Sequence, residues 1–278
     1  MTGYARPRDL KEALDLRAKH PDWMLLAGGT DLMVNANHRP APAGILDLWR
    51  LPGLGGIVAA DSHVTIGAGA TWYEVETHTA ILERWLPLAL AAREIGALQI
   101  QARGTLGGNV GNSSPVGDSL PVLLALDAEL ELASVRGTRR IAYKDFCTGY
   151  KKTALAPDEL IVGATLPAPS KTTRTTWRKV GTRRAQSISK VMGAAAIDLD
   201  GGVVKSARVA LGAVADRPIR VAAVENAVRG LTPDQAAEAA RAALRTAIKP
   251  IDDVRSTAVY RLAVAENLVA RFFSGILS

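Results

Sequence analysis

Two glycine pairs are the residues of this chain best suited to hold a ligand through the backbone. Gly28 and Gly29 stand in Leu-Ala-Gly-Gly-Thr-Asp at 26–31, and Gly107 and Gly108 stand in Thr-Leu-Gly-Gly-Asn at 105–109. Glycine has no Cβ atom, so its backbone adopts left-handed angles and approaches other groups closely. A row of exposed N–H groups in such a turn attracts anions, and phosphate groups in particular.

The ordinary explanation for one glycine pair near a strand end is a tight turn. Two pairs, each preceded by an apolar residue and accompanied by small polar residues, favour a ligand site instead. Neither segment has the lysine and spacing of a Walker A motif or the G-x-G-x-x-G of a Rossmann turn. Mononucleotide hydrolysis and classical NAD binding are therefore disfavoured.

An elongated diphosphate lying between two backbone cradles fits this pattern. The N–H groups of both loops would neutralise its charge, and four side chains are candidates for further hydrogen bonds: Thr30, Thr105, Asn109 and Ser113. Asp118 follows the second loop and has two interpretations. Its carboxylate could accept hydrogen bonds from ribose hydroxyls, or it could be the N-cap of a helix that runs through Leu126.

The composition of the chain limits the alternatives. The 278 residues carry a formal charge of +7, and basic residues gather between Arg174 and Lys190. Aromatic residues make up 5% of the chain, too few near this segment for a nucleic-acid stacking platform, so no nucleic-acid partner is expected. A small anionic ligand or an acidic protein surface fits the basic segment better.

Cysteine and histidine usage argues against metal chemistry on this chain. Cys147 is the sole cysteine, so this chain cannot hold an iron–sulfur cluster through cysteines of its own. The four histidines have no metal-ligand spacing. No apolar stretch reaches the roughly 18 residues of a membrane span. The N-terminal residues carry charge and proline where a secretory signal needs an apolar core, so we expect a cytoplasmic protein.

Hydrophobic periodicity predicts a mixed α and β chain. A small β-α-β unit is expected first, with its glycine turn at a strand end, followed by a hairpin, helices and further strands. Thr71 and Glu74 have the spacing of a capping box. The expected helices cover 8–20, 71–85, 86–95, 118–126, 221–229, 233–248 and 255–273. The expected strands cover 23–27, 45–48, 57–60, 63–68, 129–132, 141–143, 175–180, 191–199 and 207–213, with a hairpin turn at 200–202.

Prolines, small residues and hydroxyls concentrate at 167–173, and we place a domain boundary there. The first domain covers 1–168, with sub-parts of about 1–56 and 57–168, and the second covers 173–278.

At both glycine motifs the sequence resembles the medium, FAD-binding subunits of molybdenum hydroxylases, the carbon monoxide dehydrogenase and xanthine dehydrogenase group. The resemblance continues in order through 145–152, 157–161 and 178–190, so it spans nearly the whole chain. It implies an α+β fold: a two-part FAD-binding domain of the PCMH and vanillyl-alcohol-oxidase type, followed by a C-terminal domain built of a three-stranded antiparallel sheet with helices.

The resemblance also assigns residues to FAD. It places the diphosphate against Ala27, Gly28, Gly29, Thr30 and Asp31 and against Thr105, Gly107, Gly108 and Asn109, with Asp118 at the ribose, Leu160 and Ile161 at the adenine, and Lys179 at the isoalloxazine. Ile95 occupies a position where some relatives place an aromatic residue against the ring, so it is left out of this set. The first loop has no histidine or cysteine, which predicts non-covalent FAD.

The implied function is electron transfer within a complex. A large molybdopterin-binding subunit would oxidise the substrate, a small iron–sulfur subunit would relay electrons, and this chain would pass them to NAD, a quinone or oxygen. Arg183, Arg184 and Lys190 would attract an anionic acceptor or dock an acidic partner. Two alternatives are a self-sufficient FAD oxidoreductase and a flavin-free assembly subunit.

Overall fold

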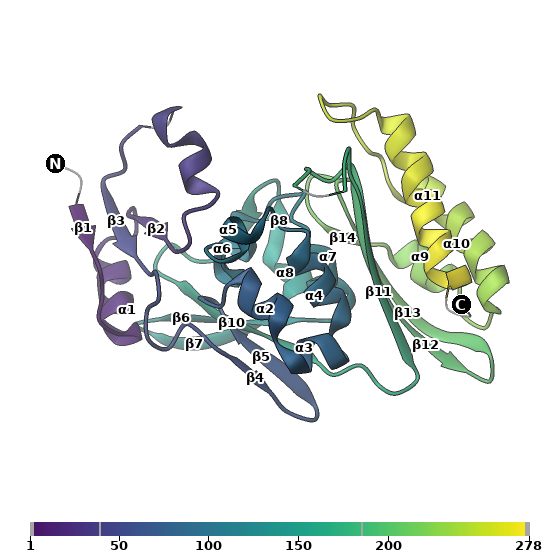
Figure 1. The fold of residues 1–278 in the computed structure, drawn as a ribbon, viewed down its shortest axis with the longest axis horizontal. Coiled ribbons are helices and arrows are strands. Elements are labelled where there is room, and N and C mark those ends of the chain that lie inside the picture. The colour runs from purple at the N-terminus through teal and green to yellow at the C-terminus, as the bar shows by residue number, and fades with distance from the viewer. Residues whose placement is uncertain (1–2, 39, 185, 276–278) are drawn as a thin grey trace.

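The computed structural model describes residues 3–38, 40–184 and 186–275. Three parts follow one another along the longest axis, from the N-terminal strands to the C-terminal helices (Figure 1). In chain order the elements are β1 (Gly3–Ala5), α1 (Leu10–Lys19), β2 (Met24–Leu26), the 3-10 helix η1 (Leu32–His38), β3 (Gly44–Asp47), β4 (Ile57–Ala59), β5 (His63–Gly67), α2 (Trp72–Thr77), α3 (Thr79–Arg84), α4 (Leu86–Arg93), α5 (Leu98–Gln101), α6 (Leu106–Asn112), α7 (Leu120–Ala125), β6 (Glu129–Ser134), β7 (Gly137–Ala142), α8 (Tyr143–Phe146), β8 (Cys147–Gly149), β9 (Lys152–Thr153), β10 (Leu160–Pro167), β11 (Thr173–Val180), β12 (Val191–Asp200), β13 (Val203–Gly212), β14 (Ile219–Arg220), α9 (Ala222–Ala227), α10 (Pro233–Ala247) and α11 (Ala258–Ser274).

The N-terminal part is a parallel sheet in the order β1-β3-β2. Asp9 caps α1 by accepting a hydrogen bond from the Glu12 amide, which satisfies one of the free N–H groups at the start of the helix. The predicted β-α-β unit is confirmed, although its connecting helix is 3-10. The first glycine pair lies directly after β2, at the carboxyl end of a parallel strand.

The middle part is a five-stranded sheet in the order β4-β5-β10-β6-β7. The predicted β4–β5 hairpin is confirmed, whereas the central strand β10 is not among the expected strands. The helix expected over 71–85 is wrong as one element, because His78 is extended with ψ 121° and separates α2 from α3. The Thr77 hydroxyl bonds back to the Tyr73 carbonyl, a contact that disfavours continued helix. The capping box of Thr71 and Glu74 is present.

The C-terminal sheet is antiparallel in the order β11-β12-β13-β14. The expected three strands are present, and the two-residue strand β14 is added to them. Helices α4 and α7 cover one face, and α9, α10 and α11 cover the other (Figure 1). Burial on both faces explains the near-continuous apolar run of β12. Gly201 and Gly202 have positive φ, as the predicted hairpin turn requires.

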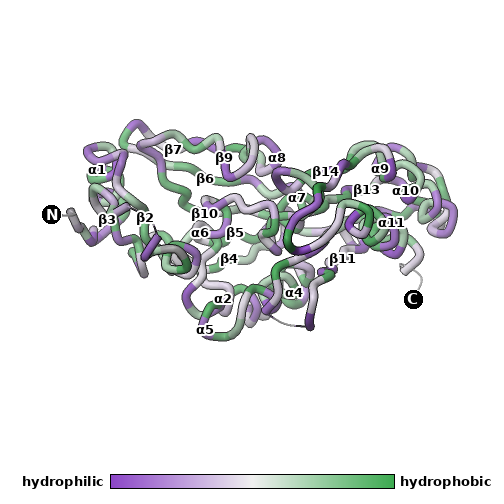
Figure 2. Tube along the Cα trace, turned by 90° about the horizontal axis from the view of Figure 1, so that it is seen from above, coloured by the Kyte–Doolittle hydropathy of each residue, from purple (hydrophilic) through white to green (hydrophobic). Residues whose placement is uncertain are grey.

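The two predicted domains share buried side chains. Trp177 and Ala194, from the C-terminal sheet, belong to the same core as Leu88 and Leu123 of α4 and α7. A second core lies between this sheet and α9–α11. Hydrophilic and hydrophobic residues are mixed along α10 and α11 (Figure 2). Among the described residues, no helix is long and apolar enough to cross a membrane.

Candidate functional site

The first glycine pair is required by the backbone of its loop. A methyl group built on Gly28 would overlap the carbonyl oxygen of Arg103 and lie 2.5 Å from the carbonyl carbon of that residue. Gly29 has φ +77°, a left-handed conformation that costs an L-residue with a side chain roughly 1–2 kcal/mol. Gly28 therefore lets the first loop pack against the start of the second, and Gly29 lets the chain turn into η1.

The amide groups of this loop are available to a ligand. Within residues 3–38, 40–184 and 186–275, the N–H groups of Gly28, Gly29, Thr30 and Asp31 donate to no protein acceptor. Gly28, Gly29 and Thr30 are half-buried and Asp31 is exposed, so water or a ligand can satisfy these N–H groups. Successive free N–H groups form a concave anion site, which the sequence predicts here.

The second glycine pair has a different role from the one expected. The Gly107 amide donates to the Ala68 carbonyl at 2.7 Å, and the Gly108 amide donates to the Thr105 hydroxyl at 3.1 Å. These two amides are therefore not free for an anion, which corrects the prediction of a second backbone cradle. A methyl group on Gly107 would lie 2.8 Å from the Ala68 Cβ, so close packing explains this glycine.

The predicted polar side chains divide into two groups. Thr30, Thr105 and Asn109 line a common cavity, and Asn109 accepts a hydrogen bond from the Ser119 hydroxyl at 2.9 Å. That bond uses the side-chain oxygen of Asn109, and its side-chain nitrogen makes no hydrogen bond within the described residues. Ser113 is fully buried and donates to the Cys147 sulfur at 3.1 Å, so it does not line the cavity and its expected contact with the ligand is wrong.

Both loops face a single cavity of about 570 Å³. Its wall includes every residue that the resemblance assigns to FAD except Asp118 and Lys179: Ala27, Gly28, Gly29, Thr30, Asp31, Thr105, Gly107, Gly108, Asn109, Leu160 and Ile161. Trp72 of α2 and Ile100 of α5 add apolar surface that sequence reasoning missed, and Ile95 lines the cavity as well. Gly104, which directly precedes the second motif, also lines it and could have been included on that ground.

Asp118 and Lys179 form a buried ion pair. The Lys179 ammonium lies 2.6 Å from Asp118 Oδ2, and the Ser189 hydroxyl donates to Oδ1 at 2.6 Å. Burial raises the pKa of the Asp118 carboxyl above its ordinary value, while the Lys179 ammonium opposes that rise. Asp118 does not cap α7, because Ser119 holds the N-cap position without a side-chain bond.

The ion pair supports the cavity from behind its wall. Lys179 also donates to the carbonyl oxygen of Glu94 at 3.2 Å, and the next residue, Ile95, lines the cavity. The structure thus ties β11 to the end of α4. It does not bring Asp118 or Lys179 to the cavity surface, where the sequence interpretation had them touch the ligand.

The first half of the basic segment belongs to β11, and the rest connects β11 to β12. Arg183 and Arg184 are exposed, and Arg183 donates to the Gln186 carbonyl. Lys190 lies 4.8 Å from the centre of the Tyr260 ring, a cation–π contact. Lys190 is therefore held beside α11, and none of these three cations lines the cavity.

Metal-binding groups and candidate nucleophiles are scarce at this site. The described residues contain no group of three or more His, Cys, Asp or Glu side chains that could hold a metal. Cys147 is buried and contacts the hydroxyls of Ser113 and Tyr143. The described wall of the cavity, which has no histidine or cysteine, combines free amides with apolar surface and suits an elongated, partly anionic ligand held without a covalent bond.

Comparisons with known proteins agree over nearly the full length. A family model described as the FAD binding domain in molybdopterin dehydrogenase matches residues 1–169, and one described as the CO dehydrogenase flavoprotein C-terminal domain matches residues 177–276. The chain is 30% identical to the nicotinate dehydrogenase FAD-subunit of Eubacterium barkeri, over 99% of this chain and 95% of that one. It is 32% identical to the xanthine dehydrogenase FAD-binding subunit of Escherichia coli O157:H7, over 98% and 94%.

A solved structure has the same fold. The carbon monoxide dehydrogenase of Hydrogenophaga pseudoflava, in a form that lacks the Mo-pyranopterin moiety of its molybdenum cofactor, matches with a TM-score of 0.92 at 30% identity. The match covers 97% of this chain and 95% of that one.

Proposed function

This chain belongs to the family of FAD-binding subunits of molybdopterin dehydrogenases, and from that premise we propose how its residues serve an FAD-dependent electron-transfer subunit. The subunit is the flavoprotein component of an oxidoreductase that contains molybdenum. It accepts electrons from an iron–sulfur subunit and passes them to an external acceptor. The molybdopterin and the iron–sulfur clusters belong to partner subunits, a large one and a small one.

The first loop carries this proposal. Gly28 to Asp31, whose N–H groups donate to no acceptor in the described structure, line the same cavity as the second motif. A diphosphate would supply acceptors to amides that otherwise have none in the described structure. Hydrogen bonds to a charged acceptor contribute roughly 1.5–3 kcal/mol each, so two or three of them account for much of a tight cofactor affinity.

We assign the remaining wall by chemistry. Thr105, Gly107, Gly108 and Asn109 lie across from the first loop, and we propose that they confine the diphosphate through shape and the Asn109 amide. Leu160 and Ile161 offer apolar surface for the adenine. These roles keep the charged centre of the cofactor at the free amides and its ring systems against carbon.

Asp118 and Lys179 receive a revised role in the proposal. Their ion pair is almost closed to solvent, with the Asp118 and Lys179 side chains 10% and 5% exposed, and Lys179 connects it to the Glu94 carbonyl beside the cavity residue Ile95. We propose that the pair fixes the backbone before Ile95 and so shapes one end of the site. In this proposal Asp118 and Lys179 act on the site through that backbone rather than through direct contacts with the ribose and the isoalloxazine.

FAD supplies the chemistry of the subunit by accepting electrons singly and releasing them singly or as a hydride. The chain needs no acid–base pair for that work. Its residues bind the cofactor, orient it and present the fixed positive potential of backbone amides. The lack of histidine and cysteine on the described wall supports non-covalent attachment.

The electron acceptor is NAD, a quinone or oxygen. The basic turn between β11 and β12 offers a way to test whether it is NAD. We propose that Arg183 and Arg184 attract an anionic acceptor. A variant with both arginines replaced by glutamate then has a several-fold higher Michaelis constant for NAD in the assembled enzyme and an unchanged constant for an uncharged quinone. Unchanged constants for all three acceptors contradict this role.

The visible spectrum of the purified chain tests the cofactor, and purification from the native host tests the assembly. We expect a yellow protein that is inert alone and is recovered with molybdenum and iron–sulfur subunits. A colourless chain that cannot be reconstituted with FAD identifies a flavin-free assembly subunit. A yellow chain that turns over a substrate unaided identifies a self-sufficient oxidoreductase.

A further inference from the structure

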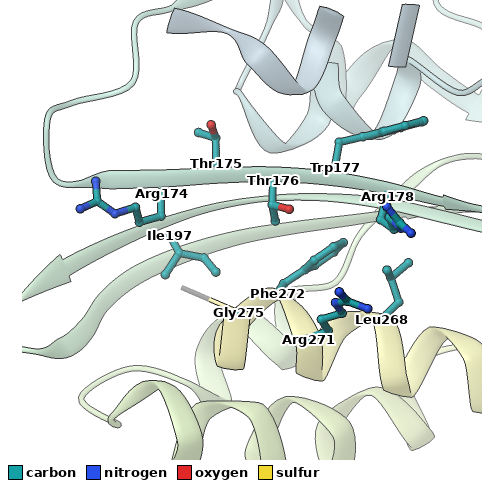
Figure 3. Close-up of a pocket in the computed structure, with 10 residues that line it drawn as sticks. All are labelled: Arg174, Thr175, Thr176, Trp177, Arg178, Ile197, Leu268, Arg271, Phe272 and Gly275. Atoms are coloured by element: carbon teal, nitrogen blue, oxygen red, sulfur yellow. The ribbon is translucent and has the colours of Figure 1, made fainter. Parts of the chain in front are cut away.

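A second hollow lies between β11 and α11, away from the cofactor cavity. It has a volume of about 360 Å³. Figure 3 shows Thr176 and Arg178 on the side of β11 that faces α11, with Thr175 and Trp177 on the opposite side. Leu268 and Phe272 of α11 provide its apolar floor. The hollow is therefore a groove along one strand, and nothing in the proposed electron transfer uses it.

Positive charge in this groove has no counter-charge among the residues that the structure describes. Arg174, Arg178 and Arg271 line it and are exposed, whereas no described Asp or Glu does so. The guanidinium groups of Arg178 and Arg271 make no hydrogen bond or ion pair within the described residues. A helix dipole explains Arg271 by itself, and protection of a sheet edge explains Arg178 by itself. Neither explains why both line the same groove over an apolar floor.

The backbone beside the groove is open. β11 is the edge strand of its sheet and pairs only with β12 among the described strands. Apart from that ladder, the backbone from Arg174 to Lys179 makes no hydrogen bond within the described ranges. An edge strand of this kind can accept an additional strand from another chain.

We propose that an extended, acidic segment of a companion subunit occupies this groove and adds as a strand to the free edge of β11. Arg174 and Arg178 lie on one face four residues apart, which is roughly 13 Å along a strand. One small anion cannot span that distance, whereas carboxylates at alternate positions of an added strand can. This inference rests on the proposed function only in requiring that the chain is one subunit of a complex.

The test uses the tagged chain in its native host with all companion subunits. In the double variant Arg178→Glu with Arg271→Glu, repulsion replaces two charge-assisted contacts, and we expect recovery of the complex to fall about 100-fold at equal salt. A matched control is Arg229→Glu with Lys249→Glu, which makes the same change in charge at exposed residues outside the groove. The control complex is expected to be recovered normally, and both variants are expected to keep their FAD.

Amide hydrogen exchange adds a readout that charge alone does not move. On assembly, the amides of β11 from Arg174 to Lys179 exchange more slowly if a strand is added. Equal recovery of both double variants, or unchanged exchange in β11, overturns the proposal. A third result also overturns it: inorganic phosphate slows amide exchange at the groove, while Arg178→Glu with Arg271→Glu leaves recovery of the complex unchanged. A wild-type chain that is colourless and cannot be reconstituted with FAD refutes the proposed function instead, and a yellow wild-type chain that forms no complex overturns this inference.

Discussion

Gly28→Ala adds one methyl group at the point where the two ligand loops touch. The methyl carbon would overlap the Arg103 carbonyl oxygen and lie 2.5 Å from the carbonyl carbon, whereas unbonded carbon atoms rest about 3.5–4.0 Å apart. Both obstacles are backbone atoms, so no side-chain rotation relieves the overlap. One loop must move by more than about 1 Å to restore ordinary contact distances.

The cost falls on FAD binding more than on folding. A shift of that size misaligns the N–H groups of Gly28 to Asp31, and losing two charge-assisted hydrogen bonds weakens FAD binding by about 3–6 kcal/mol, or roughly 10²–10⁴-fold. Overpacking destabilises the chain without cofactor by a further ~1–3 kcal/mol.

The assay is a fluorescence titration of the chain without cofactor, paired with urea unfolding. Gly55→Ala is the control, because a methyl group at Gly55 would meet no atom within 4 Å and the residue has no positive φ. We expect the control to bind FAD normally. If Gly28→Ala binds FAD within threefold of the wild type, the loops do not hold the cofactor as described.

Three further predictions concern the site and the residues that support it. Asp118→Asn leaves the Lys179 ammonium buried without a counter-charge, so we expect urea unfolding to show a free energy of unfolding about 3–5 kcal/mol lower. The control Asp216→Asn, at an exposed ion pair, should lower it by under about 1 kcal/mol, and equal decreases would contradict the role of burial. Hydrogen bonds from Arg139 hold the pKa of the Glu159 carboxyl below its ordinary value, so the stability that the ionised carboxylate contributes is fully present above about pH 4.3 and is lost as the pH falls through the lower folded pKa. The difference in free energy of unfolding between the wild type and Glu159→Gln should therefore shrink between about pH 5 and pH 3. A difference that stays constant over this range would refute the argument. Precipitation with acid should leave all the flavin in the supernatant, and flavin in the pellet would indicate a covalent bond that the described cavity wall does not explain.

Local sequence signals predicted the parts of the fold that local interactions determine. The capping box at Thr71 and Glu74 and the double-glycine turn at 200–202 occur where the sequence placed them. Strand β10 was missed because Leu160 to Pro167 is defined by partners about 30 and 100 positions away in β6 and β5. The break at His78 depends on a hydroxyl that bonds back along the helix.

The candidate site shows the same division. The glycine motifs identify the residues that meet at the cavity, because close backbone approach requires glycine in any context. They do not reveal that the Gly107 amide is already bonded to Ala68, which lies 39 positions earlier. Nor does the sequence around Asp118 indicate that its partner is Lys179, 61 positions further on. Only the fold decides which polar groups remain free for a ligand.

Residue-resolved amide exchange in the glycine-labelled chain, with and without FAD, tests the central claim most directly. The amides of Gly28 and Gly29 have no protein acceptor in the described structure, so FAD should slow their exchange strongly. Those of Gly107 and Gly108 already donate to protein oxygens and should change much less. Strong FAD protection at Gly107 and Gly108, with none at Gly28 and Gly29, would contradict the account.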